Sequence, residues 1–389
     1  MKAQVIAAVG LVVSLAVVSG AGADVLSMGG MRNADGSWNG LASLETVPVG
    51  NPGNAGELSG TGAGGDGPDR ICGAVDYGFN IGKYEVTAGQ YCEFLNAVAD
   101  SDTYALYNLA MDRDSGAPYG SQYGCSIKRS GSPGAYTYTV ASDYANRPVT
   151  HIGWADAARF ANWLHNGQHT GAQDSSTTED GAYDLISTQQ YYGPNGELPL
   201  HTSTDYTALV EALLAITRKA DWKWAITNED EWYKAAYYEP AMESYYDYTT
   251  RSDSMPGLDM TEITSPGNNA NYSRYPNFIE PLYYTTVVGE FELSDSPYGT
   301  FDQGGNIWEW LEAVPSGQYS GMRGSAWEDS YSYMHSAARV DGFYPTWEWQ
   351  DFGFRVVQAP EPASLVLLAL GGLALIPRRR KWPATQTMP

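Results

Sequence analysis

The chain has 389 residues, with 22 lysines and arginines against 45 aspartates and glutamates, and therefore carries a formal net charge of −23. Aromatic residues make up 13% of it, and most of them are tyrosine or tryptophan. So acidic a composition predicts a globular protein that binds neither nucleic acid nor an anionic membrane surface directly.

The first 23 residues have the order of a secretory signal peptide. Lys2 supplies the charged start, and an apolar run over residues 5–18 follows it. Small residues at 21–23, Ala-Gly-Ala, complete the pattern of a cleavage site. We therefore expect cleavage before Asp24 and export of the rest of the chain.

Residues 24–44 are rich in glycine and asparagine, which predicts a loop-rich lead-in, and we place the start of the main domain at residue 45. One strand is expected near residues 44–49, and the alternation over residues 77–84 predicts another. Thr87 and Gln90 have the spacing of a capping box, which predicts the start of a helix. The apolar face of that helix holds Tyr91, Phe94, Leu95 and Val98.

Two further helices are expected downstream. The first covers residues 154–164, where an apolar stripe recurs at helical spacing. The second is short and is predicted to begin at Thr227, with Asp230 completing its cap and Trp232 facing inward. Turn-forming residues dominate elsewhere, and the remaining strand candidates are short.

The C-terminal segment, residues 359–389, has the features of a sorting or anchoring tail. Pro360-Glu361-Pro362 leads into an apolar run over residues 363–376, and a basic cluster follows at residues 378–381. A membrane span needs roughly 20 apolar residues, so this run is short. The order resembles the PEP-CTERM tail of Gram-negative bacteria, which implies recognition by an exosortase-type enzyme and transient or permanent contact with the inner membrane. An ordinary tail anchor is the alternative.

Three motifs near the C-terminal end are the most informative part of the chain. They are residues 296–310 (SPYGTFDQGGNIWEW), 323–325 (RGS) and 353–356 (GFRV). Together with earlier blocks at 81–87, 147–158 and 229–236, they resemble the formylglycine-generating enzyme, or sulfatase-modifying factor, family over roughly residues 45–358. The resemblance implies an α+β fold, a C-type-lectin-like fold with little regular secondary structure.

The family's oxidase activity depends on two cysteines that follow its R-G-G-S block and hold copper(I). The matching segment here, residues 323–339, contains no cysteine, and the alignment places Glu328 and Tyr331 at the two positions. A carboxylate and a phenol provide no soft site for copper(I) and no redox-active thiol. We therefore expect no catalytic residue there, no copper and no formylglycine generation. The three cysteines that the chain does have, at positions 72, 92 and 125, lie far upstream and allow at most one disulfide.

The resemblance also implies two calcium sites. The first maps onto the side chains of Asp302 and Glu309 and the backbone carbonyls of Gly305 and Ile307, all of which are hard oxygen ligands. The alternative is that the two carboxylates cap turns or pair with Arg323 or Arg355. The second site aligns less closely. Its members are Asn271, Glu280 and the carbonyls of Tyr272 and Leu282.

The resemblance implies a ligand surface in the segment after residue 323, because the family uses this region to hold its substrate peptide. Aromatic and acidic side chains gather there in the sequence, and such side chains are frequent in recognition surfaces. The predicted surface consists of Trp327, Glu328, Asp329, Tyr331, Tyr333 and Trp347, with Tyr344, Glu348 and Trp349 beside them.

The leading hypothesis is an exported, non-catalytic, calcium-stabilised module at the cell surface that binds an extracellular polysaccharide or a protein. An oxidoreductase related to the formylglycine-generating enzyme is the alternative, with an active site that is rebuilt or different. Glu328, Asp329 and His335 are the candidates for such chemistry. A third hypothesis is a purely structural component of the envelope or matrix.

Overall fold

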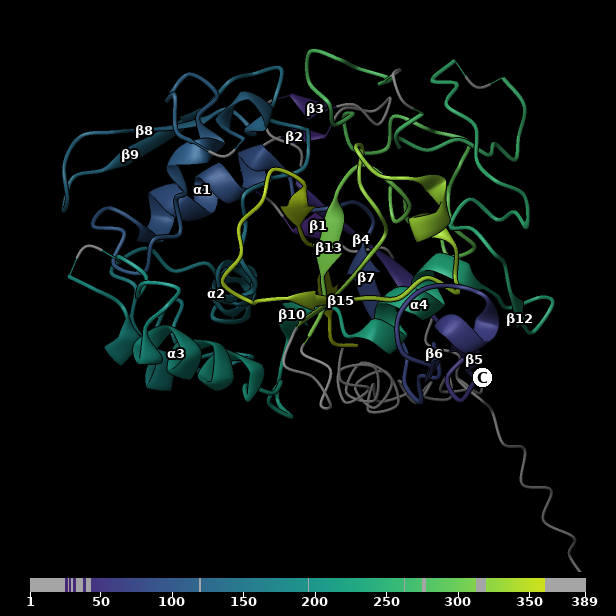
Figure 1. The fold of residues 1–389 in the computed structure, drawn as a ribbon, viewed down its shortest axis with the longest axis horizontal. Helices are drawn as coiled ribbons and strands as arrows, with labels where there is room; N and C mark the ends of the chain where they lie inside the picture. The colour runs from purple at the N-terminus through teal and green to yellow at the C-terminus, as the bar shows by residue number, and fades with distance from the viewer. Residues whose placement is uncertain are drawn as a thin grey trace, which may run out of the picture. The chain divides into compact units, whose positions relative to one another are not determined.

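A five-stranded sheet with the order β1-β4-β7-β17-β10 forms the centre of the fold (Figure 1). Its strands are Val25–Leu26 (β1), Leu44–Val49 (β4), Phe79–Gly82 (β7), Val356–Gln358 (β17) and Trp224–Ile226 (β10). Strand β7 pairs antiparallel with both β4 and β17, so the two ends of the domain meet in one sheet. The strands expected near residues 44–49 and within residues 77–84 are confirmed.

The computed structural model describes residues 25–26, 28, 31–32, 38–39, 43–118, 120–194, 196–261, 263–274, 278–312 and 320–360. All of them belong to one unit, Gly22–Pro360. The predicted signal peptide and nearly all of the predicted C-terminal tail lie outside the described residues.

A second sheet has four strands in the order β15-β14-β13-β16. They are Val340–Phe343 (β15), Ser320–Arg323 (β14), Trp308–Trp310 (β13) and Phe352–Gly353 (β16). Small antiparallel pairs complete the strands: Met31–Arg32 (β2) with Trp38–Asn39 (β3), Glu57–Ser59 (β5) with Arg70–Cys72 (β6), Ile127–Ser130 (β8) with Thr137–Val140 (β9), and Tyr238–Glu239 (β11) with Ser244–Tyr245 (β12).

The helices α1 (Ala88–Val98) and α2 (Trp154–His165) begin where the sequence predicts. The Thr87–Gln90 capping box is present, with both of its hydrogen bonds. Both helices contribute to an aromatic core, in which the ring of Phe160 packs on Phe94 and Phe354 at centroid distances of 5.3 Å each. The hairpin β8–β9 packs along α1 (Figure 1).

The helix α4 (Glu229–Tyr237) corrects the predicted start. Asn228, not Thr227, is the N-cap, and Glu231, not Asp230, completes the capping box. The side chain of Asn228 accepts a hydrogen bond from the Glu231 N–H at 2.9 Å, and the Glu231 carboxylate accepts from the Asn228 N–H at 2.9 Å. Asp230 is free to face outward from this cap, toward Arg70.

The helix α3 (Thr204–Leu214) was not predicted, although its sequence holds the signals. Ser203 caps it by accepting a hydrogen bond from the Tyr206 N–H at 3.1 Å, and Leu209 and Leu213 are buried. In Figure 1 this helix lies well away from α4, β5 and β6. The single-turn or short 3-10 helices are Thr61–Ala63, Leu109–Met111, Ser121–Tyr123, Ile186–Tyr191 and Tyr331–Met334.

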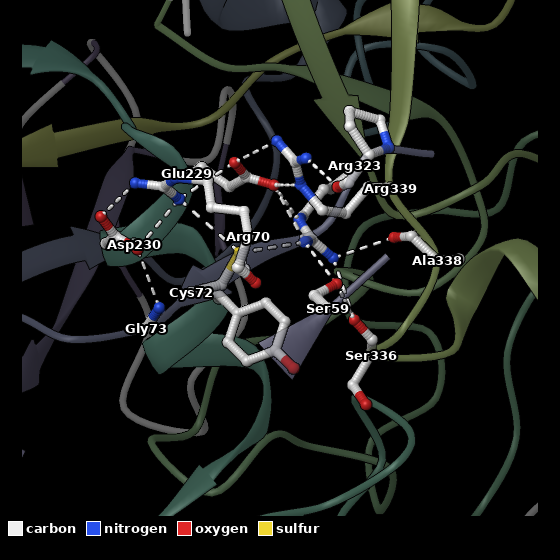
Figure 2. A network of polar contacts seen from close by, with 12 residues as sticks. Ser59, Arg70, Cys72, Gly73, Glu229, Asp230, Arg323, Ser336, Ala338 and Arg339 are labelled. Atoms are coloured by element: carbon white, nitrogen blue, oxygen red, sulfur yellow. Dashed lines mark hydrogen bonds and ion pairs between the residues drawn. The ribbon is translucent and has the colours of Figure 1, made fainter. Parts of the chain in front are cut away.

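A charged network joins α4 to β6 and β14 (Figure 2). The carboxylate of Glu229 accepts hydrogen bonds from Arg323 at 3.0 Å, from Arg339 at 2.8 and 2.9 Å, and from Arg70 at 3.0 Å. Burial alone would raise the pKa of Glu229, but the charges of Arg323, Arg339 and Arg70 outweigh it and lower the pKa to about 2. One carboxylate therefore pairs with guanidinium groups from three separate segments of the chain, and Asp230 supplies a second negative charge to Arg70.

Replacing Glu229 with glutamine is expected to destabilise the domain by about 3–5 kcal/mol, because buried guanidinium charges lose their counter-charge. The stabilisation by Glu229 is complete above its ordinary pKa of 4.5 and is lost as the pH falls toward about 2, so the variant should lack this acid-sensitive component. Urea unfolding at pH 7 and in the acid range measures both effects. Asp230→Asn is the matched control: Asp230 is partly exposed, and an equal loss in both variants would contradict the argument.

Candidate functional site

The candidate site is a cavity with a volume of about 870 Å³. Its walls come from four parts of the chain that are distant in sequence: residues between 108 and 123, His151, Leu198 with His201, and residues 346–350. The last of these segments leads directly into β16 of the second sheet. The central fold therefore fixes one wall of the cavity.

Two tryptophans form an aromatic platform on that wall. The rings of Trp347 and Trp349 are nearly parallel, with an interplanar angle of 13° and centroids 5.6 Å apart. Trp349 is also nearly parallel to Phe352, a buried residue of β16, at 5.8 Å. Phe352 anchors the stack in the core, while half of the Trp349 surface stays exposed to solvent.

Glu348 lies between these tryptophans in the sequence and also lines the cavity. Its Oε2 accepts a hydrogen bond from the Asn108 side-chain amide at 2.5 Å. Burial raises the pKa of Glu348 well above its ordinary value, and the nearby charge of Asp156 raises it further. Burial likewise raises the pKa of Asp156, and the two carboxyl groups line one small void behind the cavity. Protonation of this pair is therefore favoured, because two charges here would repel each other with little solvent.

His151 is 1% exposed and occupies the left-handed backbone region, with φ 59°. The backbone N–H of His151 donates to the Trp349 carbonyl at 2.9 Å, which ties His151 to the aromatic platform. The Nδ1 atom lies 3.4 Å from the Glu348 carbonyl, and the Nε2 atom has no hydrogen-bond partner among the described residues. Burial lowers the pKa of His151 to about 4, so the ring is neutral and one nitrogen keeps a free lone pair.

The first predicted calcium site is only partly assembled from the predicted ligands. Glu309 is fully buried, and both of its oxygens pair with Arg355 at 2.6 Å, as the alternative interpretation had it. It also accepts a hydrogen bond from the Trp232 indole at 2.8 Å. Asp302, in contrast, accepts from the Gly289 N–H at 2.6 Å and has no arginine bonded to it among the described contacts. Burial raises the pKa of Asp302 to about 6.

Glu85 is a further acidic group in this region that the sequence analysis missed. It is 1% exposed, and its Oε1 has no hydrogen-bond partner within the described part of the chain. Burial and the charge of Asp302 raise its pKa well above the ordinary value. Glu85 lies within the family-like block at residues 81–87, which was the available signal.

Two carboxylates that share one region, the buried Glu85 and the half-buried Asp302, fit a divalent cation, which would supply the positive charge that they lack. No cluster of three His, Cys, Asp or Glu side chains arranged for a metal occurs among the described residues. A calcium ion at Asp302 and Glu85 would therefore need backbone carbonyls, such as those of Gly305 and Ile307, to complete its shell.

The second predicted calcium set is divided between separate contacts. The Glu280 carboxylate pairs with Arg147, and the Leu282 carbonyl accepts from Arg113 at 2.9 Å. The side-chain amide of Asn271 donates to the Tyr284 carbonyl at 2.8 Å. Tyr272 is buried, and its hydroxyl donates to the Pro256 carbonyl at 2.7 Å. Two of the four expected ligands thus have arginine partners.

The family profile of the sulfatase-modifying factor enzyme 1-like domain matches residues 65–360. The chain belongs to this family. The expected α+β class is confirmed, since helices and short strands are mixed within one irregular domain.

Solved structures give further comparisons. Treponema denticola variable protein 1 is 15% identical, with a TM-score of 0.45, over 87% of this chain and 99% of its own. CarF is 19% identical, with a TM-score of 0.44, over 82% and 99% of the two chains. PvdO from Pseudomonas aeruginosa is 17% identical, with a TM-score of 0.43, over 85% and 98%. No curated protein matches the chain.

In this sulfatase-modifying factor domain, the segment after residue 323 borders the cavity. Glu328 is exposed and accepts a hydrogen bond at 3.1 Å from Gln350, which lines the cavity. Trp327 is buried and packs on Tyr123 of the opposite wall, with ring centroids 5.2 Å apart. Of the predicted ligand surface, Trp347 lines the cavity, and Glu328 and Trp327 each contact a lining residue.

The rest of the predicted surface lies further along. The Asp329 carboxylate accepts from the Trp308 indole at 2.7 Å, and the ring of Tyr333 packs against Trp308 at 5.7 Å. Tyr331 is 40% exposed and faces Tyr272, with centroids 6.3 Å apart. None of these three is among the residues described as lining the cavity.

The three residues of the rival enzymatic hypothesis have different environments. Burial raises the pKa values of Glu328 and Asp329, and both carboxyl groups interact with Asp351. His335 instead faces Asp247, at 3.7 Å, and its ring packs on Tyr248. The described contacts therefore bring Glu328 and Asp329 together with Asp351, but they do not bring His335 to these carboxyl groups.

Stability should fall as the pH rises toward and above neutrality. A carboxyl group with a raised pKa in the folded state binds its proton more tightly than in the unfolded state, so its contribution is lost as the pH rises through the raised pKa. For Asp156 the loss begins above its ordinary pKa of 3.8 and amounts to on the order of 4 kcal/mol by neutral pH. Asp156→Asn should flatten this slope in urea unfolding between pH 5 and 8. The exposed control Glu93→Gln should leave it unchanged; equal slopes in all three proteins would rule out the argument.

Proposed function

We propose that this chain is an exported, non-catalytic ligand-binding module that acts at the cell surface or in the extracellular matrix. The observation that carries the proposal is the tryptophan-lined cavity. Glu328 lies at its rim, where it accepts a hydrogen bond from the lining residue Gln350. Glu328 stands where the family resemblance places the first catalytic cysteine. The position of a catalytic residue in the family thus borders the proposed ligand-binding cavity in this chain.

The state of the thiols supports a non-catalytic role. Cys72, Cys92 and Cys125 are all buried and free. Burial raises the pKa of each, that of Cys92 to about 12, so all three are thiols at neutral pH. Copper(I) binding and redox chemistry both need a thiolate. Cys72 packs with Trp232 in one hydrophobic cluster, whereas Cys92 and Cys125 belong to the main core.

Export and sorting complete the proposal. The signal-like residues 1–23 and the tail at residues 359–389 support secretion, followed by processing or anchoring through an exosortase-type enzyme at the inner membrane. Within the described residues, no helix is both long and apolar enough to cross a membrane. The ligand would then be an extracellular polysaccharide or a protein of the matrix.

Calcium is proposed as a structural ion at Asp302 and Glu85. The support is this pair of carboxylates, one of which has an oxygen without a partner among the described residues. Because the Glu309–Arg355 pair is already complete, the ion would strengthen the loop around residue 302 rather than take part in ligand contacts.

Immobilised wild-type protein should retain soluble exopolymer from the producing cells, and Trp349→Ala should retain at least about tenfold less, because removal of a central aromatic anchor costs 2 kcal/mol or more. Chemical analysis of the retained material distinguishes polysaccharide from protein. Tyr331→Ala is the control, since Tyr331 is about as exposed as Trp349 but lies outside the cavity lining. Equal retention by all three proteins, or conversion of a sulfatase-type cysteine peptide by the wild type, would refute the binding proposal.

Calcium should raise the melting temperature of the purified protein, and EDTA should lower it by several degrees, since a ligand that binds only the folded state stabilises it. Metal analysis should give one or more calcium ions per chain and no copper. Glu85→Gln should reduce the response to calcium. A calcium response of the same size in Glu85→Gln would remove Glu85 from the site, and no response in the wild type would remove calcium from the proposal.

A further inference from the structure

The described lining of the cavity offers no lysine or arginine charge to attract an anion. His151 is neutral because burial lowers its pKa to about 4, and the whole chain is strongly acidic. Sulfate, phosphate or uronic acid groups would therefore lose solvation here without gaining an ion pair.

The cavity is equally poor in isolated negative charge. Glu348 lines it, but its carboxylate shares a poorly solvated region with Asp156 and is bonded to the Asn108 amide. Burial and Asp156 raise the pKa of Glu348, which favours the neutral form. The lining itself therefore favours an uncharged ligand, and the exposed Glu328 carboxylate lies at the rim.

What the cavity does offer is an aromatic face beside hydrogen-bonding groups. Trp349 presents an exposed ring that is held in place by Trp347 and Phe352. The face of an indole is electron-rich and attracts the C–H groups on one side of a saturated ring. Amide side chains of Gln122 and Gln350 line the same cavity.

His151 adds a specific demand for a donor. Its Nε2 is buried and has no partner among the described residues, although the ring lines the cavity. The Nδ1 atom lies 3.4 Å from the Glu348 carbonyl oxygen, which can only accept, and the Gly120 carbonyl also acts on the ring; we assign the single N–H of the neutral ring to Nδ1. The Nε2 lone pair then needs an O–H or N–H from the occupant of the cavity.

We propose that the cavity binds a neutral carbohydrate, one sugar ring of which stacks on Trp349 while a hydroxyl group donates to Nε2 of His151. This inference rests on the proposed binding function and names its ligand class. A neighbouring cavity of about 510 Å³ shares His201 and runs along α3, which provides room for further sugar units. The ligand is therefore an oligosaccharide stretch rather than a single sugar.

The test uses the full exported chain and neutral hexasaccharides of glucose, mannose and xylose, with oligogalacturonate of equal length as the charged comparison. Isothermal titration should detect at least one neutral hexasaccharide at millimolar concentration and no oligogalacturonate. Trp349→Ala and His151→Asn should each weaken binding at least about tenfold, and asparagine tolerates the positive φ at residue 151.

Variants at Glu348 separate a neutral ligand from a cationic one. Glu348→Gln keeps a polar side chain of the same length and should weaken hexasaccharide binding less than about threefold, whereas Glu348→Ala should weaken it about tenfold. Circular dichroism and thermal unfolding verify that each variant is folded.

Two outcomes overturn the carbohydrate inference. One is the absence of binding by every neutral hexasaccharide, and the other is binding that Trp349→Ala and His151→Asn leave unchanged. If the hexasaccharides fail but matrix protein is still retained in a Trp349-dependent way, only the ligand class is wrong. If neither ligand is retained, the proposed binding function fails as well.

Discussion

The buried pair between Arg355 and Glu309 is the interaction on which the rest of the fold depends. Neither side chain is exposed, and two hydrogen bonds of 2.6 Å join them. Arg355 also donates to the carbonyls of Gly82 in β7 and Phe301, each at 2.9 Å. Because Glu309 belongs to β13, this one guanidinium ties the central sheet to the second sheet. Removal of either partner would leave an uncompensated charge in the core, which is far more costly than the loss of an exposed pair.

Some buried carboxylates pair with arginine, and others have no arginine bonded to them among the described contacts. Three arginines surround Glu229 and lower its pKa to about 2, whereas burial without such partners raises the pKa values of Glu85, Asp156 and Glu348. These three carboxyl groups lie in two places. Glu85 is near Asp302, and Asp156 and Glu348 line the small void next to the cavity. Interiors keep such groups only at a cost in stability, so their positions mark where an ion, a proton or a ligand completes the structure.

Local signals predicted the elements that depend on neighbouring residues. The capping box at Thr87, the stripe of α2 and the strand at residues 44–49 are all set within a few residues, and all are confirmed. The cap of α4 was misplaced by one residue because Thr227, Asn228 and the acidic run after them offer two overlapping capping patterns. Helix α3 was overlooked, although Ser203 and the buried leucines carry its pattern.

The candidate site was less predictable because its walls meet only in three dimensions. Trp347 could be named from its place after the family motif, but His151 and the residues between 108 and 123 join it through long-range packing that no spacing reveals. The role of Glu309 likewise depended on which of two partners, calcium or Arg355, the fold would bring to it. Sequence patterns identify which groups need a partner, and the topology decides which partner arrives.

The contacts that hold the cavity wall differ from those of the segment that contains Glu328. The wall formed by residues 346–350 is anchored through the Trp349–Phe352 stack to β16, and β16 pairs with β13, the strand of Glu309. The segment with Glu328 contacts the cavity lining through the hydrogen bond from Gln350 to Glu328 and through the packing of Trp327 on Tyr123. Position 328 is therefore linked to the wall by one side-chain hydrogen bond, whereas the anchor of the wall is the stack of Trp349 on Phe352.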